Sequence, residues 1–340
     1  MQDRTDPLRA LPPCSPLRAR RAFRAHFRPP FCRDFDLRAR TRHDSIVVFF
    51  KRAFFASLAL GLALAAPAHA AHRAHPRLPR GGRTLFPHYR LVGFCGTPGA
   101  PALGKLRGDL AARAREIEKL GQEYGDGRAV LPTFELIAVV VTGDPGRDGL
   151  SRRRVPDSVI RDYLEAARAA KGILLLDIQP GHSDFMTEVK ALEPWLREPD
   201  VSVALDPEWA MPGPRWRPGV HWGHTTGEVV SEVAQYLSSI VKRWDLPEKP
   251  LVFHQVNDHV FAHDDALRPA PGVVIVKSVD GRGIRGAKVK TYDALIESIP
   301  ANVHPGFKLF FDEDTRDGSK LMKPRDVLAL TPEPEYVVYE

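Results

Sequence analysis

Short apolar runs recur along the chain from about Thr84, and longer amphipathic stretches separate them. We expect eight strands, at 91–96, 135–143, 172–179, 201–209, 250–256, 272–280, 307–313 and 334–340. Most runs are apolar at consecutive positions rather than at alternate ones. That pattern is typical of strands that are buried on both faces of a parallel sheet.

The stretches between these runs have the periodicity of helices. We expect helices at 103–125, 156–172, 183–198, 225–244, 291–299 and 323–330. The first two end on a glycine, as helices often do, and the second has Pro156 and Asp157 in its first turn. Pro194 falls inside the third, so we expect it to kink or end that helix.

Eight strands with intervening helices predict a (β/α)₈ barrel of the TIM type over residues 84–340. This segment has 257 residues, close to the typical barrel length of about 250. The alternative is an open, doubly wound α/β sheet, which usually carries a Gly-rich phosphate loop after its first strand. The glycines of "GFCGTPGAPALG" do not fit the G-x-G-x-x-G spacing, which favours the barrel.

The N-terminal part has a different organisation. Lys51 to Ala70 shows two cations, an apolar run over 53–66 and small residues before a cleavage point after Ala70, so 47–70 is expected to be a signal peptide. The run is too short for a membrane span, and a short buried helix is the alternative. Residues 1–46 are rich in arginine and proline, and we interpret them as a non-native or disordered basic extension. Residues 71–83 are expected to be a linker.

The location of the charge changes what the basic composition implies. The chain has a net charge of +7, but residues 1–70 hold 13 of the 49 Lys and Arg and 5 of the 42 Asp and Glu. The remainder, with 36 basic and 37 acidic residues, is nearly neutral. We therefore expect no nucleic-acid partner. Cys95 is the single cysteine after residue 70, so it predicts neither a disulfide nor a cysteine metal cluster.

Polar or ionisable residues end almost every expected strand, and a barrel collects function at these ends. They are Thr142, Asp144, Asp177, Gln179, Asp206, Glu208, Trp209, His254, Gln255, Asp258, Lys277, Asp280, Asp312, Glu313 and Asp314.

Two short motifs, "LLLDIQ" and "VALDPEW", place acids at the ends of adjacent strands. Asp206 and Glu208 are two residues apart and should share one side of a strand, as should Asp177 and Gln179. Burial and crowding would raise the pKa of such a carboxyl, as a general acid near neutral pH requires. The alternative is structural: Asp206 would begin a turn, and Asp177 would cap the next helix.

Aromatic and histidine residues suggest further chemistry. Trp209, Trp216 and Trp222 lie in or next to a loop rich in Pro and Gly, where they could bind sugar rings or pack in the core. The segment "HQVNDH", with His254, Asp258 and His259, could ligate a metal, but it does not match H-E-x-x-H, and we predict no metal site. Lys277 could form a Schiff base or pair with a buried acid.

In layout the chain resembles secreted (β/α)₈ glycoside hydrolases, on the basis of the strand count and the two acidic motifs. It lacks the D-x-x-D-x-D-x-E run and the Asn-Glu pair that some of those families carry. The resemblance implies an exported, monomeric hydrolase with no stable membrane span, which acts on a polysaccharide or cell-wall glycan without a cofactor. The expected catalytic residues are Glu208, as proton donor, with Asp206 or Asp177.

The remaining site expectations concern substrate binding. The residues expected to hold the sugar are Gln179, Trp209, Trp222, His254, Gln255, Asp258, Lys277, Asp312 and Glu313. Two alternatives stay open: a non-catalytic glycan-binding barrel that uses the same mouth, and a metal-assisted hydrolase built on the region around His254.

Overall fold

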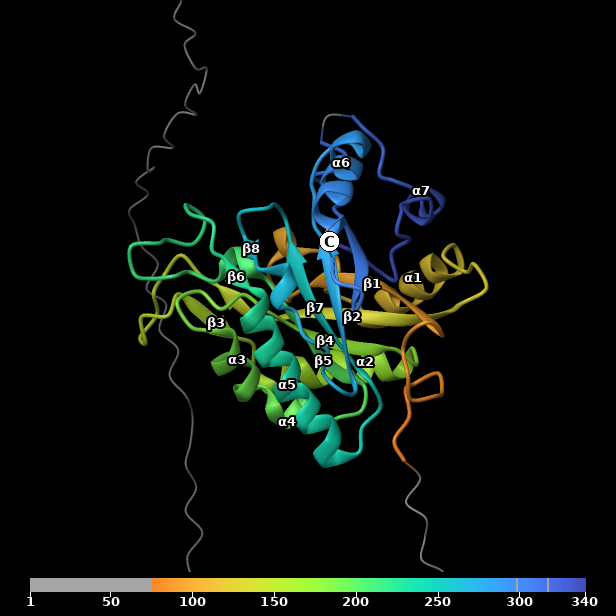
Figure 1. The fold of residues 1–340 in the computed structure, drawn as a ribbon, viewed down its shortest axis with the longest axis horizontal. Coiled ribbons are helices and arrows are strands. Elements are labelled where there is room, and N and C mark those ends of the chain that lie inside the picture. Colours follow the sequence, from red (N-terminus) through yellow and green to blue (C-terminus); the bar gives the residue numbers. More distant parts are fainter. Residues whose placement is uncertain (1–74, 298, 317) are drawn as a thin grey trace, which may run out of the picture. The chain divides into compact units, whose positions relative to one another are not determined.

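Eight parallel strands form a closed ring in the computed structural model, which describes residues 75–297, 299–316 and 318–340 (Figure 1). In chain order they are β1 (Tyr89–Gly96), β2 (Ala129–Val141), β4 (Ile173–Ile178), β5 (Val201–Leu205), β7 (Lys249–Gln255), β9 (Val273–Val279), β10 (Val303–Leu309) and β11 (Tyr336–Tyr339). Strand β1 pairs with both β2 and β11, which closes the ring. The predicted barrel is confirmed. The expected signal peptide and basic extension lie outside the described residues.

Helices follow the strands and pack against the outer face of the ring. They are α1 (Leu110–Gln122), α2 (Asp157–Ala169), α3 (Phe185–Ala191), α4 (Glu193–Leu196), α5 (Gly227–Trp244), α6 (Arg285–Ile296) and α7 (Pro324–Leu328). As expected, the helix around Pro194 is interrupted: α3 ends before Leu192, and the proline lies in the first turn of α4. Helix α6 begins six residues earlier than the apolar pattern predicted.

The strand ends differ from the expected bounds in two places that matter for the site. Strand β2 begins at Ala129, six residues earlier than expected, and continues beyond the ring to pair with the antiparallel β3 (Arg152–Arg154). Strand β5 stops at Leu205, and a 3₁₀ turn follows over Pro207–Trp209. A small parallel pair, β6 (Thr225–Thr226) and β8 (Phe261–Ala262), was not expected.

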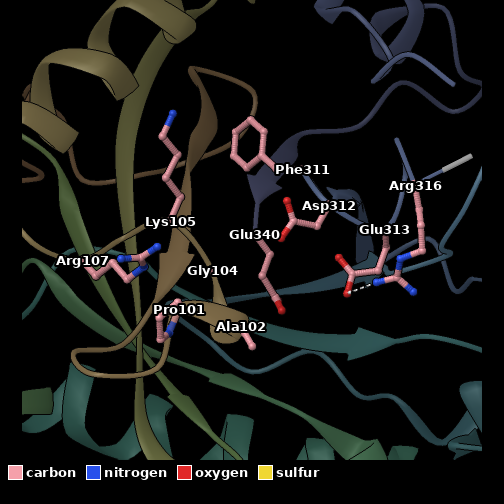
Figure 2. Close-up of a pocket in the computed structure, with 10 residues that line it drawn as sticks. All are labelled: Pro101, Ala102, Gly104, Lys105, Arg107, Phe311, Asp312, Glu313, Arg316 and Glu340. Atoms are coloured by element: carbon pink, nitrogen blue, oxygen red, sulfur yellow. Dashed lines mark ion pairs between the residues drawn. The ribbon is translucent and has the colours of Figure 1, made fainter. Parts of the chain in front are cut away.

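The barrel interior has an apolar part and a polar part. Toward the strand starts it is filled by buried apolar residues such as Leu91, Leu131, Val252 and Val276. Toward the carboxyl ends the inward positions become charged. At this end the segments after β1 and after β10 come together around the side chain of Glu340 (Figure 2).

The segment before β1 covers the opposite end of the barrel. Leu78 and Leu85 are buried among the apolar interior residues. The Arg80 guanidinium donates to the Val130 carbonyl at 2.9 Å, and Arg83 donates to the Leu246 carbonyl at 2.9 Å. The expected linker over 71–83 therefore belongs, at least from Leu78, to the packed domain. Among the described residues, no helix combines the length and apolar character needed to cross a bilayer.

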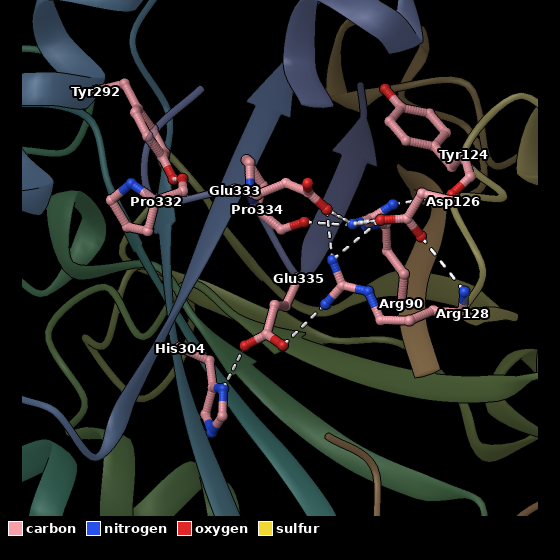
Figure 3. Close-up of polar contacts among 10 residues, drawn as sticks. All are labelled: Arg90, Tyr124, Asp126, Arg128, Tyr292, His304, Pro332, Glu333, Pro334 and Glu335. Carbon is pink, nitrogen blue, oxygen red and sulfur yellow. Dashed lines mark hydrogen bonds and ion pairs between the residues drawn. The ribbon is translucent and has the colours of Figure 1, made fainter. Parts of the chain in front are cut away.

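An ion-pair network joins the starts of the first and last strands (Figure 3). The buried Arg90 on β1 donates to the carbonyls of Tyr124 (2.8 Å) and Pro334 (3.1 Å), and it pairs with Asp126 (2.9 Å) and Glu333. These partners precede β2 and β11, the two neighbours of β1 in the ring. Because one guanidinium serves both neighbours, Arg90 stabilises the point where the barrel closes.

Replacing Arg90 with Met is expected to lower the free energy of unfolding by about 3–5 kcal/mol, since it leaves acids and carbonyls without their buried partner. Urea denaturation of the parent and the variant measures the change. The control is Arg115→Met, because Arg115 is exposed and lies 4.0 Å from Asp109. An Arg90 variant as stable as this control would contradict the role given to the network.

Candidate active site

Carboxyl groups gather inside the carboxyl end of the barrel, where six of them meet two cationic side chains. The carboxyls belong to Glu135, Asp177, Asp206, Glu208, Asp280 and Glu340, and the cations are His254 and Lys308. All except Glu340 are buried. They come from seven of the eight strands or from the turns that follow them, so the closed ring itself brings them together.

His254 is held between two acids. Its Nδ1 lies 3.0 Å from Asp280 Oδ2, and its Nε2 lies 3.5 Å from Glu135 Oε2. The Tyr336 hydroxyl donates to the same Glu135 oxygen, and the Ser278 hydroxyl donates to Asp280 at 2.9 Å. Each acid is thus fixed by a second partner, and the imidazole has one orientation.

Lys308 extends this chain of contacts toward the surface. Its Nζ lies 3.3 Å from Asp280 Oδ2 and 2.6 Å from Glu340 Oε2. Because Glu340 lines a cavity, Lys308 connects that cavity to the buried His254–Asp280 pair.

Both acidic motifs lie at strand ends, and the structure shows what each of their acids contacts. A 3₁₀ turn does begin after Asp206, but the Asp206 side chain does not cap it; it accepts from Gln179 Nε2 at 3.0 Å. Glu208 lies within that turn rather than on the strand, and it is still buried. Asp177 caps no helix, because Asp184 is the N-cap of α3. The structural alternative therefore explains the turn but not the two aspartates.

Several buried atoms of this cluster have no hydrogen-bond partner among the described residues. They are Glu135 Oε1, Asp177 Oδ2, Asp206 Oδ1, Glu208 Oε2 and His254 Nε2. Unpartnered buried polar atoms are uncommon and point to a proton, a ligand or an ion. The ligand atoms of Asp177, Asp206 and His254 all lie within 4.8 Å of one another, so these three residues could hold a metal ion.

Burial and neighbouring charges raise the pKa of some acids in the cluster and lower the pKa of others. Burial, with the neighbouring Asp206 and Asp280, raises the pKa of Glu208 to about 8. Burial, with Asp206 and Glu135, raises the pKa of Asp177 well above its usual range. Burial would also raise the pKa of Glu135 and Asp280, but His254 and Lys308 more than offset it and lower both. Glu208 therefore keeps its proton at neutral pH, the pKa of Asp177 is shifted in the same direction, and Glu135 and Asp280 are anions.

Two cavities lie beside the cluster at the carboxyl end of the ring. One, of about 400 Å³, lies over β1, β10 and β11 and is lined by Glu340, Asp312, Glu313 and the cations Lys105, Arg107 and Arg316 (Figure 2). The other, of about 330 Å³, lies over the ends of β5 and β9 and is lined by Trp209, Trp222, Val220, His221 and Arg282. Trp222 and Trp216 are 47% and 40% exposed, so they do not serve as core residues.

The structure brings together many of the expected site residues. Asp177, Asp206, Glu208, Gln179 and His254 meet in the cluster, and Asp312, Glu313, Trp209 and Trp222 line the cavities.

Three expected residues do not join them. Lys277 points to the outer side of β9, where it lies beside Phe261 and pairs with Asp264 at 2.9 Å. Of the two roles considered for Lys277, a Schiff base or an ion pair with an acid, the structure has the ion pair. Asp258 is on the surface, paired only with His259, and their side chains are 77% and 81% exposed. Gln255 is buried and donates to the Asn257 carbonyl. Asp258 and His259 thus lie apart from His254, so these three residues do not share a metal site, and His254 meets Asp177 and Asp206 instead.

The sequence analysis missed four members of the cluster as site residues: Glu135, Asp280, Lys308 and Glu340. Asp280 had been noted at a strand end, and the same signal applied to Glu340. Glu135 and Lys308 lie inside apolar runs, and no motif marked them. The position of Glu135 follows from the register between β1 and β2. Glu135 lies opposite Cys95, which is near the end of β1, and is therefore at the level of the mouth.

Comparisons with known proteins add little to this geometry. No family model matches the chain, and no curated protein matches it. Among solved structures, a GH18 chitinase from Pseudoalteromonas aurantia is similar at 10% sequence identity and a TM-score of 0.29, over 74% of this chain and 93% of that one. The barrel assignment follows from the strand pairing, so the expected barrel layout is confirmed by the fold itself.

The raised pKa of Glu208 has a consequence for stability. The folded carboxyl keeps its proton up to about pH 8, whereas the unfolded one loses it near pH 4.5, so the folded state binds more protons between these values. Stability contributed by this group therefore falls as the pH rises through that window. Glu208→Gln is expected to be more stable than the parent by a few kcal/mol at pH 8, with a smaller difference at pH 5.

Urea denaturation at both pH values tests this expectation. Glu297→Gln is the matched control, because Glu297 is exposed at the end of α6. A Glu208 variant that gains no stability relative to the parent between pH 5 and pH 8 would show that the folded carboxyl is ionised throughout.

Proposed function

We propose that this protein is an exported glycan-active hydrolase whose proton donor is Glu208. One observation carries the proposal: a buried carboxyl that holds its proton to about pH 8 lies among anionic carboxylates at the carboxyl end of a (β/α)₈ barrel. Active sites of such barrels lie at this end. A protonated acid beside carboxylates is the arrangement that hydrolysis of a glycosidic bond requires.

The reaction divides between two residues of the same turn. Glu208 donates its proton to the oxygen of the leaving sugar, so that the bond to the anomeric carbon breaks without forming a free alkoxide. Positive charge develops on the remaining sugar ring as this bond lengthens. Asp206, oriented by Gln179 at 3.0 Å, stabilises this charge. Water supplies the hydroxyl that bonds to the anomeric carbon, and the proton that it releases returns Glu208 to its acid form.

Asp177 and the His254 chain have supporting roles. Burial and the neighbouring Asp206 raise the pKa of Asp177, and a raised pKa suits a hydrogen-bond partner of a substrate oxygen or of Asp206 better than it suits a nucleophile. Asp280 and Glu135 fix His254 from opposite sides, and Lys308 fixes Asp280. These contacts hold the charges in place, and the pre-organised charges lower the barrier without rearranging during the reaction.

The two cavities beside the cluster accommodate different parts of the substrate. Trp209 follows Glu208 directly and lines one cavity with Trp222, where a flat apolar face can stack on a sugar ring. Asp312 and Glu313 line the other cavity, where carboxylates can accept hydrogen bonds from sugar hydroxyls. A glycan chain lying across the mouth would contact both.

A non-catalytic glycan-binding barrel is the second candidate, and one observation favours it. Glu208 is 6% exposed and Asp177 is fully buried. Hydrolysis requires the residues that cover these two acids to move aside. Binding of a glycan in the two cavities requires no such movement.

Glu208→Gln is expected to reduce hydrolysis of the substrate glycan by about 10²–10⁴-fold, because the amide cannot donate the proton. In the parent, the rate should fall as the pH rises through about 8, where Glu208 ionises. Reducing-sugar release from a panel of plant and cell-wall polysaccharides measures both effects. Asp177→Asn is expected to have a smaller effect, and Glu297→Gln none.

Three results would change the assignment. Equal activity of the Glu208 variant and the parent would remove Glu208 as donor. Glycan binding by a parent that hydrolyses no member of the panel would favour the second candidate. A stoichiometric divalent ion in the purified protein, lost in Asp177→Asn and His254→Ala, would favour metal-assisted hydrolysis over acid catalysis.

Export is tested separately. The three-part pattern over Lys51 to Ala70 supports cleavage after Ala70. N-terminal sequencing of protein recovered from the culture medium is expected to begin at Ala71. Protein that stays in the cytoplasm with residues 1–70 attached would contradict export and leave the hydrolase proposal unaffected.

A further inference from the structure

Each of the two cavities beside the cluster contains one arginine that forms no ion pair among the described residues. Arg282 lines the aromatic cavity with Trp209 and Trp222, and Arg107 lines the cavity with Glu340 (Figure 2). No ion pair or side-chain hydrogen bond within the described part of the chain involves either guanidinium.

The neighbouring cations differ from these two arginines. Lys105 pairs with Glu116 at 2.7 Å and lies over the rings of Phe94 and Phe311. Arg316 is 3.7 Å from Glu313. These two side chains already have partners within the protein, so Arg107 is the cation of that cavity that is available to a ligand.

Arg282 is positioned by its surroundings without being neutralised by them. It follows β9 two residues after Asp280, and its guanidinium lies 5.4 Å from the centre of the Phe310 ring. Stacking on an aromatic face restricts the side chain and leaves its N–H groups free in the plane of the guanidinium. Those groups match a carboxylate with two parallel hydrogen bonds.

We propose that the glycan is an acidic one, whose negatively charged sugars are bound by Arg282 in the aromatic cavity and by Arg107 in the cavity that Glu340 lines. This inference rests on the proposed function, because it names the substrate of the same site. The ring of the charged sugar stacks on Trp222 while its carboxylate pairs with Arg282. Among the described residues no acid lines the aromatic cavity of Arg282. In the cavity of Arg107, Glu340 pairs with Lys308 at 2.6 Å and Glu313 with Arg316 at 3.7 Å, which offsets two of its three acids.

The position of the two cavities also favours a polymer over a single sugar. One lies over β1, β10 and β11, and the other over β5 and β9, and β9 and β10 are neighbours in the ring. A chain that occupies both cavities lies beside Glu208, because Trp209 of the aromatic cavity directly follows it, and carries charged sugars to both arginines.

Binding of polyuronate oligomers tests the proposal, with neutral oligomers of equal length for comparison and Glu208→Gln as the protein so that no turnover occurs. Polyuronate is expected to bind at least about 10-fold more tightly than the neutral oligomer. Adding Arg282→Gln or Arg107→Gln should weaken polyuronate binding by about 10-fold each, as expected for a charged hydrogen bond, and leave neutral binding unchanged. Raising the salt concentration should weaken polyuronate binding alone.

Arg285→Gln is the matched control. This arginine is exposed on α6, three residues from Arg282, and pairs with Asp326 at 3.1 Å. It should leave both affinities unchanged. A sulfated oligomer that binds more tightly than polyuronate, with the same loss in Arg282→Gln, would support the anion site and identify sulfate as the recognised group.

Failure of this inference can be told apart from failure of the proposed function. Binding of neutral oligomers as tight as that of charged ones, or an equal loss in the Arg285 control, would overturn the acidic-glycan proposal. So would hydrolysis by the parent that is confined to neutral glycans, although the hydrolase proposal would then stand. Tight polyuronate binding by a parent that hydrolyses no glycan would support the acidic substrate and overturn the hydrolase.

Discussion

Excess negative charge inside a closed barrel is the constraint on which the rest of the site depends. Six carboxyl groups face two cations in a space with almost no solvent, where unpaired ions are costly. The interior meets this constraint in two ways. Glu135, Asp280 and Glu340 pair with the available cations, His254 and Lys308, and burial with neighbouring acids raises the pKa of Glu208 and Asp177. A proton donor at neutral pH is thus a result of charge balance in the whole cluster.

The apolar pattern predicted most of the fold because a buried parallel strand needs consecutive apolar residues and the connecting helices need one apolar face. It located all eight strands of the ring. The bounds of β2 and β5 were less certain, because β2 continues beyond the ring and the acids after Leu205 belong to a turn.

The candidate site was predicted less completely, and Lys277 and Lys308 show why. Both lie near the end of an apolar strand, but Lys277 faces the outer layer and Lys308 faces the cluster. When both faces of a strand are apolar, the sequence contains no alternation from which inward positions could be read. The assignment depends on the register between neighbouring strands, which is a property of the closed ring. The tryptophans of the mouth loops were easier to place. The prolines around them indicate a loop, so no choice between the two faces of a strand has to be made.

The segment over Leu78 to Leu85 has a practical consequence for handling the protein. It covers the end of the barrel formed by the strand starts, whereas the carboxyls and both cavities lie at the other end. An affinity tag or surface attachment placed immediately before this segment would therefore join the barrel on the side away from the mouth. Immobilised in this way, the molecule would present its two cavities to a dissolved polymer, and long glycans could reach them without meeting the support.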